Sequence, residues 1–458
     1  MNMERALTGG YDSPRFYRGT LLLIGLWVVF TSFLTPPLQS PDEWAHIKRT
    51  YQVSDGHILP VIQDGVTGGY VDTGLLAYIE SFADISYHGD RKIQSDRFFA
   101  SKQLDWSNER VFSPFPNTSV TSFVVYLPQA AGLWIGRHSG LSIHVSYSLS
   151  RILNATCVLL LFYLGSRFCP LPLPHLIIAL FPMTLFQLAS TSADGMVFGL
   201  ASLTGALVAA KLGDSFRWDS PRGIILLVAW ASLISAKLNQ LPMLFLIYLA
   251  GKPRTKTEWA CVTTALFAIL TWIVYASTHN HDPMMPDSQR AREMFIHYLS
   301  HPLETFGIVL RTLGSEVDFY WKSFVGYLGW LDAPIPLLYI HPFALLILMS
   351  IYFAHQNIKS KQSATRILIF IGLPTLITLW TFVLFLVTWS GFPTDTIKGV
   401  QGRYFIPIAL FSSYFLIRPG CTMPSVTKAK WLLAGAAALS IAGMVPTLLK
   451  RYWIEAVI

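Results

Sequence analysis

A short stretch after the first apolar run carries residue types that suit acid–base chemistry. The segment PPLQSPDEWAHIKR, residues 36–49, contains two carboxylates, a histidine and two basic side chains. If this segment is helical, Asp42, His46 and Arg49 occupy positions i, i+4 and i+7 and share one face. An acid in the first turn gains only about 0.3–1 kcal/mol from the helix dipole, and that gain does not require a histidine one turn below. We therefore expect Asp42 to have a chemical role.

The same stretch also carries signals for the start and the end of a helix. The SPDE run at 40–43 matches a capping box with proline at the first helical position, and the DG pair at 55–56 supplies the stop. These signals predict a helix of about four turns just outside the membrane. Capping is therefore an alternative to a catalytic role for Glu43. For His46 the alternative is an ordinary position at the membrane interface.

Composition indicates a polytopic membrane protein. The 458 residues are 52% hydrophobic and only 13% charged, and the charges cluster between long apolar blocks. A helix needs about 20 apolar residues to cross the hydrocarbon layer, where all its backbone polar groups must be paired. We predict an all-α fold, a single transmembrane domain over 1–458, with eleven spans near 19–36, 147–167, 171–190, 194–211, 222–236, 239–251, 258–277, 338–356, 366–389, 404–417 and 430–449.

Lysine and arginine set the expected orientation. With the N-terminus in the cytoplasm, every predicted inner segment is basic, as the positive-inside rule requires. An additional span at 126–140 would invert every later loop, so we assign that segment to the interface. Two long segments, 38–146 and 278–337, then face outward, and the first contains interfacial helices. Residues 38–120 hold 11 acidic and 7 basic residues, a net charge of −4 in a chain of net charge +8, which excludes nucleic acid as a partner.

Three cations are predicted near the outer membrane face. Arg403, in QGRY, lies where the chain re-enters the membrane, and an ionised group there needs a partner such as a lipid phosphate. Lys237, in SAKLNQLP, occupies a similar place, with simple snorkelling as the alternative. Arg151, with Asn154 about one turn on, either binds phosphate or pairs with an acid such as Asp194.

Two acids and their aromatic neighbours complete the outer face. Asp194, in SADG, is expected to cap the next span, with Ser192 as the rival cap. Asp332, in GWLDAP, lies among aromatic residues and prolines that suit a sugar face. Trp330 and Tyr327 are alternatively interfacial anchors, the commoner role of such residues.

Several strings together resemble a bacterial family of integral-membrane proteins of unknown function, which in turn resembles the GT-C glycosyltransferases. These strings are PDEWAHIKRTYQVSDGHILP, FSPFPNTSVTSFVVYLPQAAG, SRILN, TSADG, GYLGWLDAPIP and QGRYFIP, and they run from about residue 36 to 407. The resemblance implies a GT-C-like fold in the bacterial cytoplasmic membrane, with an extracytoplasmic active site. It also implies a polyprenyl-phosphate sugar donor whose lipid tail lies between helices, surrounded by membrane lipids, and a glycan or lipid-linked acceptor of the cell envelope.

On this basis Asp42 is expected to act as a general base on an acceptor hydroxyl, and His46 to orient Asp42 or to contact the sugar. One base without a second carboxylate as nucleophile implies inversion at the anomeric carbon. The expected site has three parts: the catalytic group Asp42, Glu43 and His46; the donor-phosphate group Arg403, Lys237 and Arg151; and the substrate-binding group Tyr404, Asp332, Trp330, Gln401, Asn154 and Asp194.

No cofactor is predicted, because the sequence has no phosphate-binding glycine loop and no DxD or HExxH pattern. If Asp42, Glu43 and His46 held a metal, Mg²⁺ or Mn²⁺ would be the expected ion. Two other functions stay open. One is a transporter or flippase for lipid-linked sugars, in which Asp42 only caps a helix. The other is a glycan polymerase or ligase with the same site. Transport coupling needs ionisable groups near the middle of the bilayer, and those singled out here gather at one face, which favours an enzyme.

Overall fold

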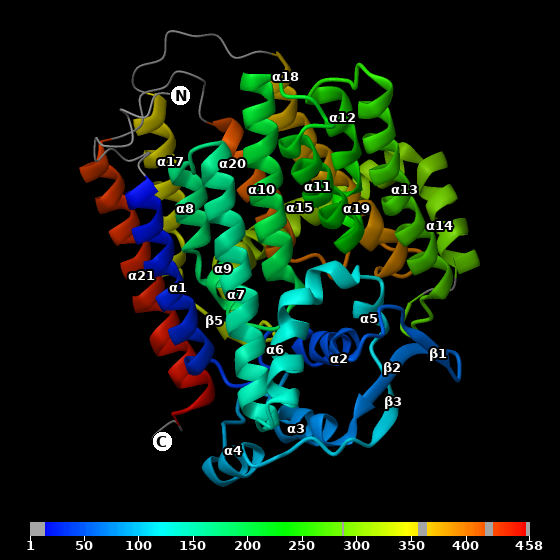
Figure 1. Ribbon diagram of the computed structural model, residues 1–458, viewed down its shortest axis with the longest axis vertical. Helices are drawn as coiled ribbons and strands as arrows, with labels where there is room; N and C mark the ends of the chain where they lie inside the picture. Colours follow the sequence, from blue (N-terminus) through cyan, green and yellow to red (C-terminus); the bar gives the residue numbers. More distant parts are fainter. Residues whose placement is uncertain (1–13, 286–287, 356–363, 417–424, 455–458) are drawn as a thin grey trace.

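The computed structural model describes residues 14–285, 288–355, 364–416 and 425–454. The chain is mostly helical, and Figure 1 shows a bundle of long helices above a layer of short helices and strands. In the described part, six helices are long and apolar enough to cross a membrane. They are α1 (Pro14–Leu34), α7 (Ile143–Phe168), α10 (Ala193–Asp214), α13 (Lys256–His279), the continuous helix α18–η4–α19 (Ala364–Ile367, Leu368–Gly372 and Leu373–Thr388) and α21 (Val426–Tyr452).

The other predicted spans coincide with shorter or broken helices. They correspond to α8 (Leu173–Ala179) with α9 (Pro182–Leu188), α11 (Pro221–Ala236), η3 (Leu238–Phe245) with α12 (Leu246–Leu249), α16 (Leu337–Ile340) with α17 (Pro342–His355), and α20 (Ile406–Leu416). The predicted span ends at 356 and 417 lie outside the described residues. The chain is thus a helical protein with six candidate spans in its described part, and the count of eleven stays a prediction.

The prediction of one continuous helix over 171–190 is wrong. The segment breaks after Ala179, and Pro182 starts the second helix, because proline lacks the N–H that a continuous helix needs. Every residue of α8 and α9 is buried, as is nearly all of α10. A helix that is apolar on all sides belongs in a protein core. These three helices therefore form the centre of the bundle, with α7, α11 and α20 against α10.

The layer below the bundle comes from the first predicted outer segment. Its helices are α2 (Glu43–Ser54), α3 (Thr73–Ala83), α4 (Ser95–Ser101), α5 (Pro116–Ser119), η2 (Phe123–Tyr126) and α6 (Leu127–His138). The 12 residues of α6 are too few to cross the bilayer, in keeping with its predicted interfacial position. Helix α2 packs against α6, which packs against α7, so the bundle holds α2 in place.

A small antiparallel sheet in this layer departs from the all-α prediction. Strands β1 (Val61–Gln63), β2 (Val66–Asp72) and β3 (Arg110–Pro114) pair in the order β1-β2-β3. Asp64 and Gly65 both have positive φ, 51° and 75°, as a tight hairpin turn requires. Strand β2 packs against α2, and Thr67 of β2 donates to the carbonyl of His279 at the end of α13.

The second predicted outer segment supports the chain that leads to Arg403. Helices α14 (Ser288–Ser300) and α15 (Pro302–Val325) form a separate hydrophobic core with α19 and residues 397–400. A short hairpin, β4 (Tyr327–Leu328) with β5 (Ala333–Pro334), follows α15. Turn η5 (Gly402–Phe405) then packs directly on α15.

Candidate functional site

Four charged side chains, each at a helix end, converge where the bundle meets the lower layer. Asp42 is the N-cap of α2, Asp194 lies in the first turn of α10, Lys237 is the C-cap of α11, and Arg403 lies in η5. Asp42 Oδ2 lies 3.1 Å from Arg403 Nη2. Lys237 Nζ lies 2.7 Å from Asp194 Oδ1, whose other oxygen is 3.9 Å from Arg403 Nη1. We call these four residues the charged cluster.

The charged cluster is electrically balanced, but its members differ in exposure. Asp194 at a helix N-terminus and Lys237 at a C-terminus each complement the helix dipole. The side chains of Arg403 and Asp194 are 5% and 9% exposed, whereas that of Asp42 is 37% exposed. Asp42 is therefore the member most accessible to a substrate.

The backbone at Asp42 is left-handed, with φ 59° and ψ 10°. Asp and Asn tolerate this conformation better than most residues, and such residues gather at functional sites. One half of the predicted capping box is present, because the Ser40 backbone N–H donates to Glu43 Oε2 at 3.2 Å, and the other half is wrong. Helix α2 begins at Glu43, and the Ser40 hydroxyl bonds Gln187 instead of capping the helix. Asn117 Nδ2 donates to Asp42 Oδ1 at 3.3 Å, so both carboxylate oxygens have a partner.

The His46 side chain lies beside the charged cluster without a hydrogen bond to the Asp42 carboxylate. Its Nδ1 is 2.7 Å from the hydroxyl of Tyr126, so the idea that His46 directly orients Asp42 is not supported. Burial, and then the charge of Lys237, lower the pKa of His46 to about 4, against the opposing effect of Asp194 and Asp42. His46 is therefore neutral at physiological pH. Arg49, predicted on the same face, instead bonds Gln52 and the carbonyl of Ile58 in the interior of the lower layer.

Burial of a neutral His46 should make the protein acid-sensitive. Because the folded-state pKa is below the unfolded value of 6.5, the unfolded chain binds more protons, and stability falls as pH drops from about 6.5 to 4, by up to about 3 kcal/mol. We expect His46→Gln to flatten this loss, since glutamine does not titrate. Melting temperatures of both proteins at pH 7 and pH 4.5 measure the effect. An equal drop in both would contradict it.

The glycine of QGRY sets the position of Arg403. A Cβ at Gly402 would lie 2.0 Å from the carbonyl oxygen of Tyr320, so only glycine lets η5 approach α15 this closely. The Gly402 N–H donates to Ser323 Oγ at 2.8 Å. Half-buried Gln401 is the N-cap of η5, and the Tyr404 ring lies under the Arg403 guanidinium at 5.2 Å. Within the described residues, the buried Nε of Arg403 has no hydrogen-bond partner.

An aromatic ledge lies at the edge of the charged cluster, made of Trp44, Tyr87 and Trp330. The Trp330 ring is 6.5 Å from that of Trp44 and 4.6 Å from that of Tyr87. Asp42 and Arg403 both act electrostatically on the Tyr87 hydroxyl, which places the ledge beside them. Such flat faces suit the apolar face of a sugar ring.

Asp332 belongs to the support of this ledge. One of its oxygens accepts the Trp330 backbone N–H at 2.9 Å, and the other lies 2.6 Å from Arg451 Nη2. Gly329, at φ 62°, lets the Asp332 carboxylate fold back onto the turn. Asp332 therefore positions Trp330, and its carboxylate is already neutralised.

Glu43 and Arg151 form a buried ion pair away from the exposed carboxylate of Asp42. Glu43 is fully buried and accepts from Tyr147, from the Thr191 backbone N–H and from Arg151 at 3.2 Å. Arg151 also donates to the backbone carbonyls of residues 32, 35 and 36. Because its donors are used, the expected phosphate contact at Arg151 is not supported, and its acidic partner is Glu43 instead of Asp194.

Asn154 and Asp194 also differ from their predicted roles. Asn154 is fully buried, and its Nδ2 donates to the Ser190 carbonyl at 2.9 Å, so it holds the turn before α10. The hydroxyl of Ser192 caps α10, while Asp194 faces Lys237, so the rival cap is the correct one. With Glu43 facing Arg151 and His46 facing Tyr126, these two do not form a metal-ligand set with Asp42.

Residues 22–412 match the family model described as "Predicted membrane protein (DUF2142)". The chain belongs to this family. No curated protein and no solved structure matches it. The family assignment covers most of the chain, and it agrees with the expected membrane family of unknown function.

Four side chains of the site were not singled out from the sequence: Asn117, Tyr126, Tyr87 and Trp44. Asn117 and Tyr126 lie in the string FSPFPNTSVTSFVVYLPQAAG, which carried the family resemblance, so the signal was present but not resolved to residues. Tyr87 has φ 65°, an unusual value that no sequence pattern here indicates.

Proposed function

We propose that this protein is an inverting glycosyltransferase that moves a sugar from a polyprenyl-phosphate carrier to a glycan or lipid-linked acceptor. The observation that carries the proposal is the contact between the exposed carboxylate of Asp42 and the buried guanidinium of Arg403 at the end of the bundle. A lipid-linked donor needs a base for the acceptor hydroxyl and a cation for the departing phosphate at similar depth.

The pairing of Asp42 with Arg403 suggests how binding and chemistry are coupled. In this pair the guanidinium of Arg403 donates to Asp42 Oδ2, so that oxygen is occupied while the contact holds. The donor phosphate competes for Arg403, whose Nε already lacks a partner among the described residues. When the phosphate takes the guanidinium, Asp42 is released to accept the proton of the acceptor hydroxyl. The base is thereby activated only when donor is bound.

The orientation belongs to the same proposal. The start of α1, the end of α10 and the start of α11 lie at the end of the bundle away from the lower layer (Figure 1). These helix ends carry Arg18, Lys211 and Arg222. The positive-inside rule assigns that end to the cytoplasm and the charged cluster to the extracytoplasmic face of a bacterial cytoplasmic membrane. The charged cluster gathers at one end of the bundle, against α2 of the lower layer, and this position favours an enzyme over a transporter.

A panel of polyprenyl-phosphate sugars tests donor binding. The purified protein should melt at a higher temperature with the matching donor, because a ligand at 100 times its Kd adds about 2.7 kcal/mol to folding. Arg403→Lys should lose most of this shift, since lysine cannot offer two parallel N–H groups.

Arg311→Lys is the matched control, because Arg311 is 54% exposed and lies outside the charged cluster. If no donor stabilises the wild type, or if Arg403→Lys responds like the wild type, the proposal fails. A transporter would bind donor equally well, so formation of a new glycosidic bond is the decisive second readout.

A further inference from the structure

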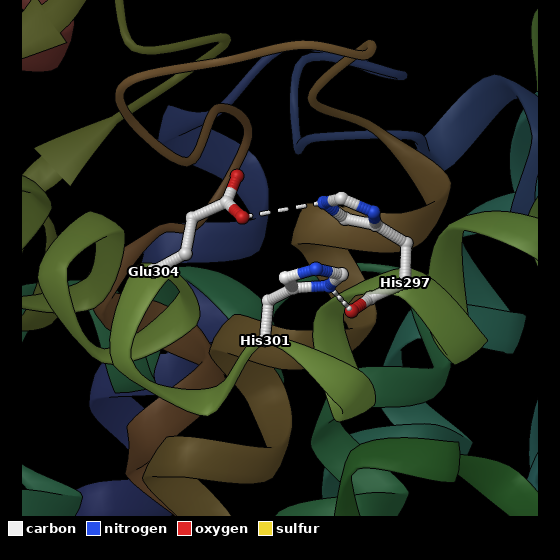
Figure 2. Close-up of side chains that lie close together, drawn as sticks. All are labelled: His297, His301 and Glu304. Carbon is white, nitrogen blue, oxygen red and sulfur yellow. Dashed lines mark hydrogen bonds and ion pairs between the residues drawn. The ribbon is translucent and has the colours of Figure 1, made fainter.

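A second cluster of possible ligands lies between α14 and α15, outside the charged cluster. His297 is in the last turn of α14, His301 immediately precedes α15, and Glu304 lies in the first turn of α15. Figure 2 shows the three side chains turned toward one another. One ligand atom from each lies within 4.8 Å of the other two.

The spacing suits a small transition-metal ion. With metal–ligand bonds of about 2.0–2.1 Å, two ligand atoms of a tetrahedral zinc site are about 3.3–3.4 Å apart. Glu304 Oε2 lies 3.3 Å from His297 Nε2. That nitrogen is buried, and among the described residues no hydrogen bond satisfies it. An ion between the two groups would use both lone pairs.

His301 is already oriented as a ligand. Its Nδ1 is 2.8 Å from the His297 backbone carbonyl, which fixes the proton on Nδ1 and leaves the lone pair on Nε2. Metal-bound histidines commonly donate their second ring N–H in this way. The two imidazoles stack at 4.3 Å with their planes 25° apart, so the His297 ring must turn before both in-plane lone pairs can point at one ion; the Phe392 ring packs against His297 at 5.0 Å.

We propose that His297, His301 and Glu304 bind a divalent transition-metal ion of the zinc class. Two imidazoles and one carboxylate are ligands that Zn²⁺ prefers, and water would take the fourth position. The ion would join α14 to α15, and α15 carries the Ser323 hydroxyl that holds the Gly402 backbone. The site thus stabilises the support of η5, and it does not depend on the proposed glycosyl transfer.

Zinc binding by the full chain tests this inference. The protein is purified in detergent with an affinity tag that lacks histidine, stripped with a chelator and titrated with ZnCl₂. We expect one ion per chain and a higher melting temperature. Changes to second-shell groups alone weaken metal binding about 10- to 100-fold, so loss of a ligand in His301→Ala should weaken it at least about 100-fold and abolish the thermal shift.

His138→Ala is the matched control. The Nδ1 of His138 also bonds the carbonyl four residues earlier, at 2.8 Å, and the residue is exposed on α6. Glu304→Gln, at a partly exposed position, gives a second variant that should fold and lose zinc. The inference is overturned if the wild type binds no zinc at micromolar concentration, or if His301→Ala and Glu304→Gln bind zinc as the wild type and His138→Ala do.

Discussion

Asp42→Asn is expected to reduce sugar transfer by about 10²- to 10⁴-fold, the usual contribution of a general base. Asparagine keeps the shape of the side chain and tolerates the left-handed backbone at φ 59°, but it cannot accept the proton of an acceptor hydroxyl. The rate is measured with the donor that most stabilises the wild type. Because the Asp42 side chain is 37% exposed, the melting temperature should change little.

Asp64→Asn is the control for this substitution. Asp64 is also left-handed, with φ 51°, and it is exposed in the β1–β2 turn away from the charged cluster. We expect its transfer rate to equal that of the wild type. Normal transfer by folded Asp42→Asn protein would remove Asp42 from the chemistry and leave the pair with Arg403 as a structural contact.

Glu43→Ala, one residue away, is expected to act on folding. It leaves the guanidinium of Arg151 buried without its partner, and breaking a buried ion pair in this way costs about 3–5 kcal/mol. The hydroxyl of Tyr147 and the backbone N–H of Thr191 lose their acceptor as well. Denaturant-induced unfolding of the detergent-solubilised protein, followed by tryptophan fluorescence, measures the change.

An exposed ion pair serves as comparison. Asp214 and Arg222 lie 3.2 Å apart with 65% and 51% of their side chains exposed, and Asp214→Ala should change the free energy of unfolding by less than about 1 kcal/mol. If Glu43→Ala unfolds like the wild type while its transfer rate collapses, Glu43 belongs to the catalytic group after all.

The sequence predicted the charged groups of the site better than their partners. The histidine one turn below points to Asp42, the cost of an ion at the membrane face points to Arg403, and the two residues lie in contact. The cost of an ion at the membrane face does not predict which polar groups are buried inside the protein. In the sequence, Arg151 and Asn154 also lie at the predicted outer end of a span. In the structure, α7 packs against α1 and α9, and this packing encloses both side chains.

The fold shows the same division. The length of the apolar stretches predicted helices, and helices are found at every expected span. The reason is that a backbone in lipid must pair its polar groups within the segment, as a helix does. In the lower layer the chain pairs strands instead, and the Asp64-Gly65 turn was the available signal for a hairpin. The break between α8 and α9 depends on Pro182, which lies inside a stretch that is apolar enough for a span. A hydropathy average over the stretch does not detect one proline.

The contact between Asp42 and Arg403 joins positions 361 residues apart, and this separation bears on biogenesis. The ribosome makes the chain from its N-terminus, so Asp42 is synthesised long before Arg403 has been translated. The lower layer also depends on a contact made late in synthesis, the hydrogen bond from the Ile93 N–H to the carbonyl of Tyr452. A chain stalled during synthesis thus has Asp42 without Arg403, and under the proposed function such a chain would lack the guanidinium that binds the donor phosphate and would not transfer sugar.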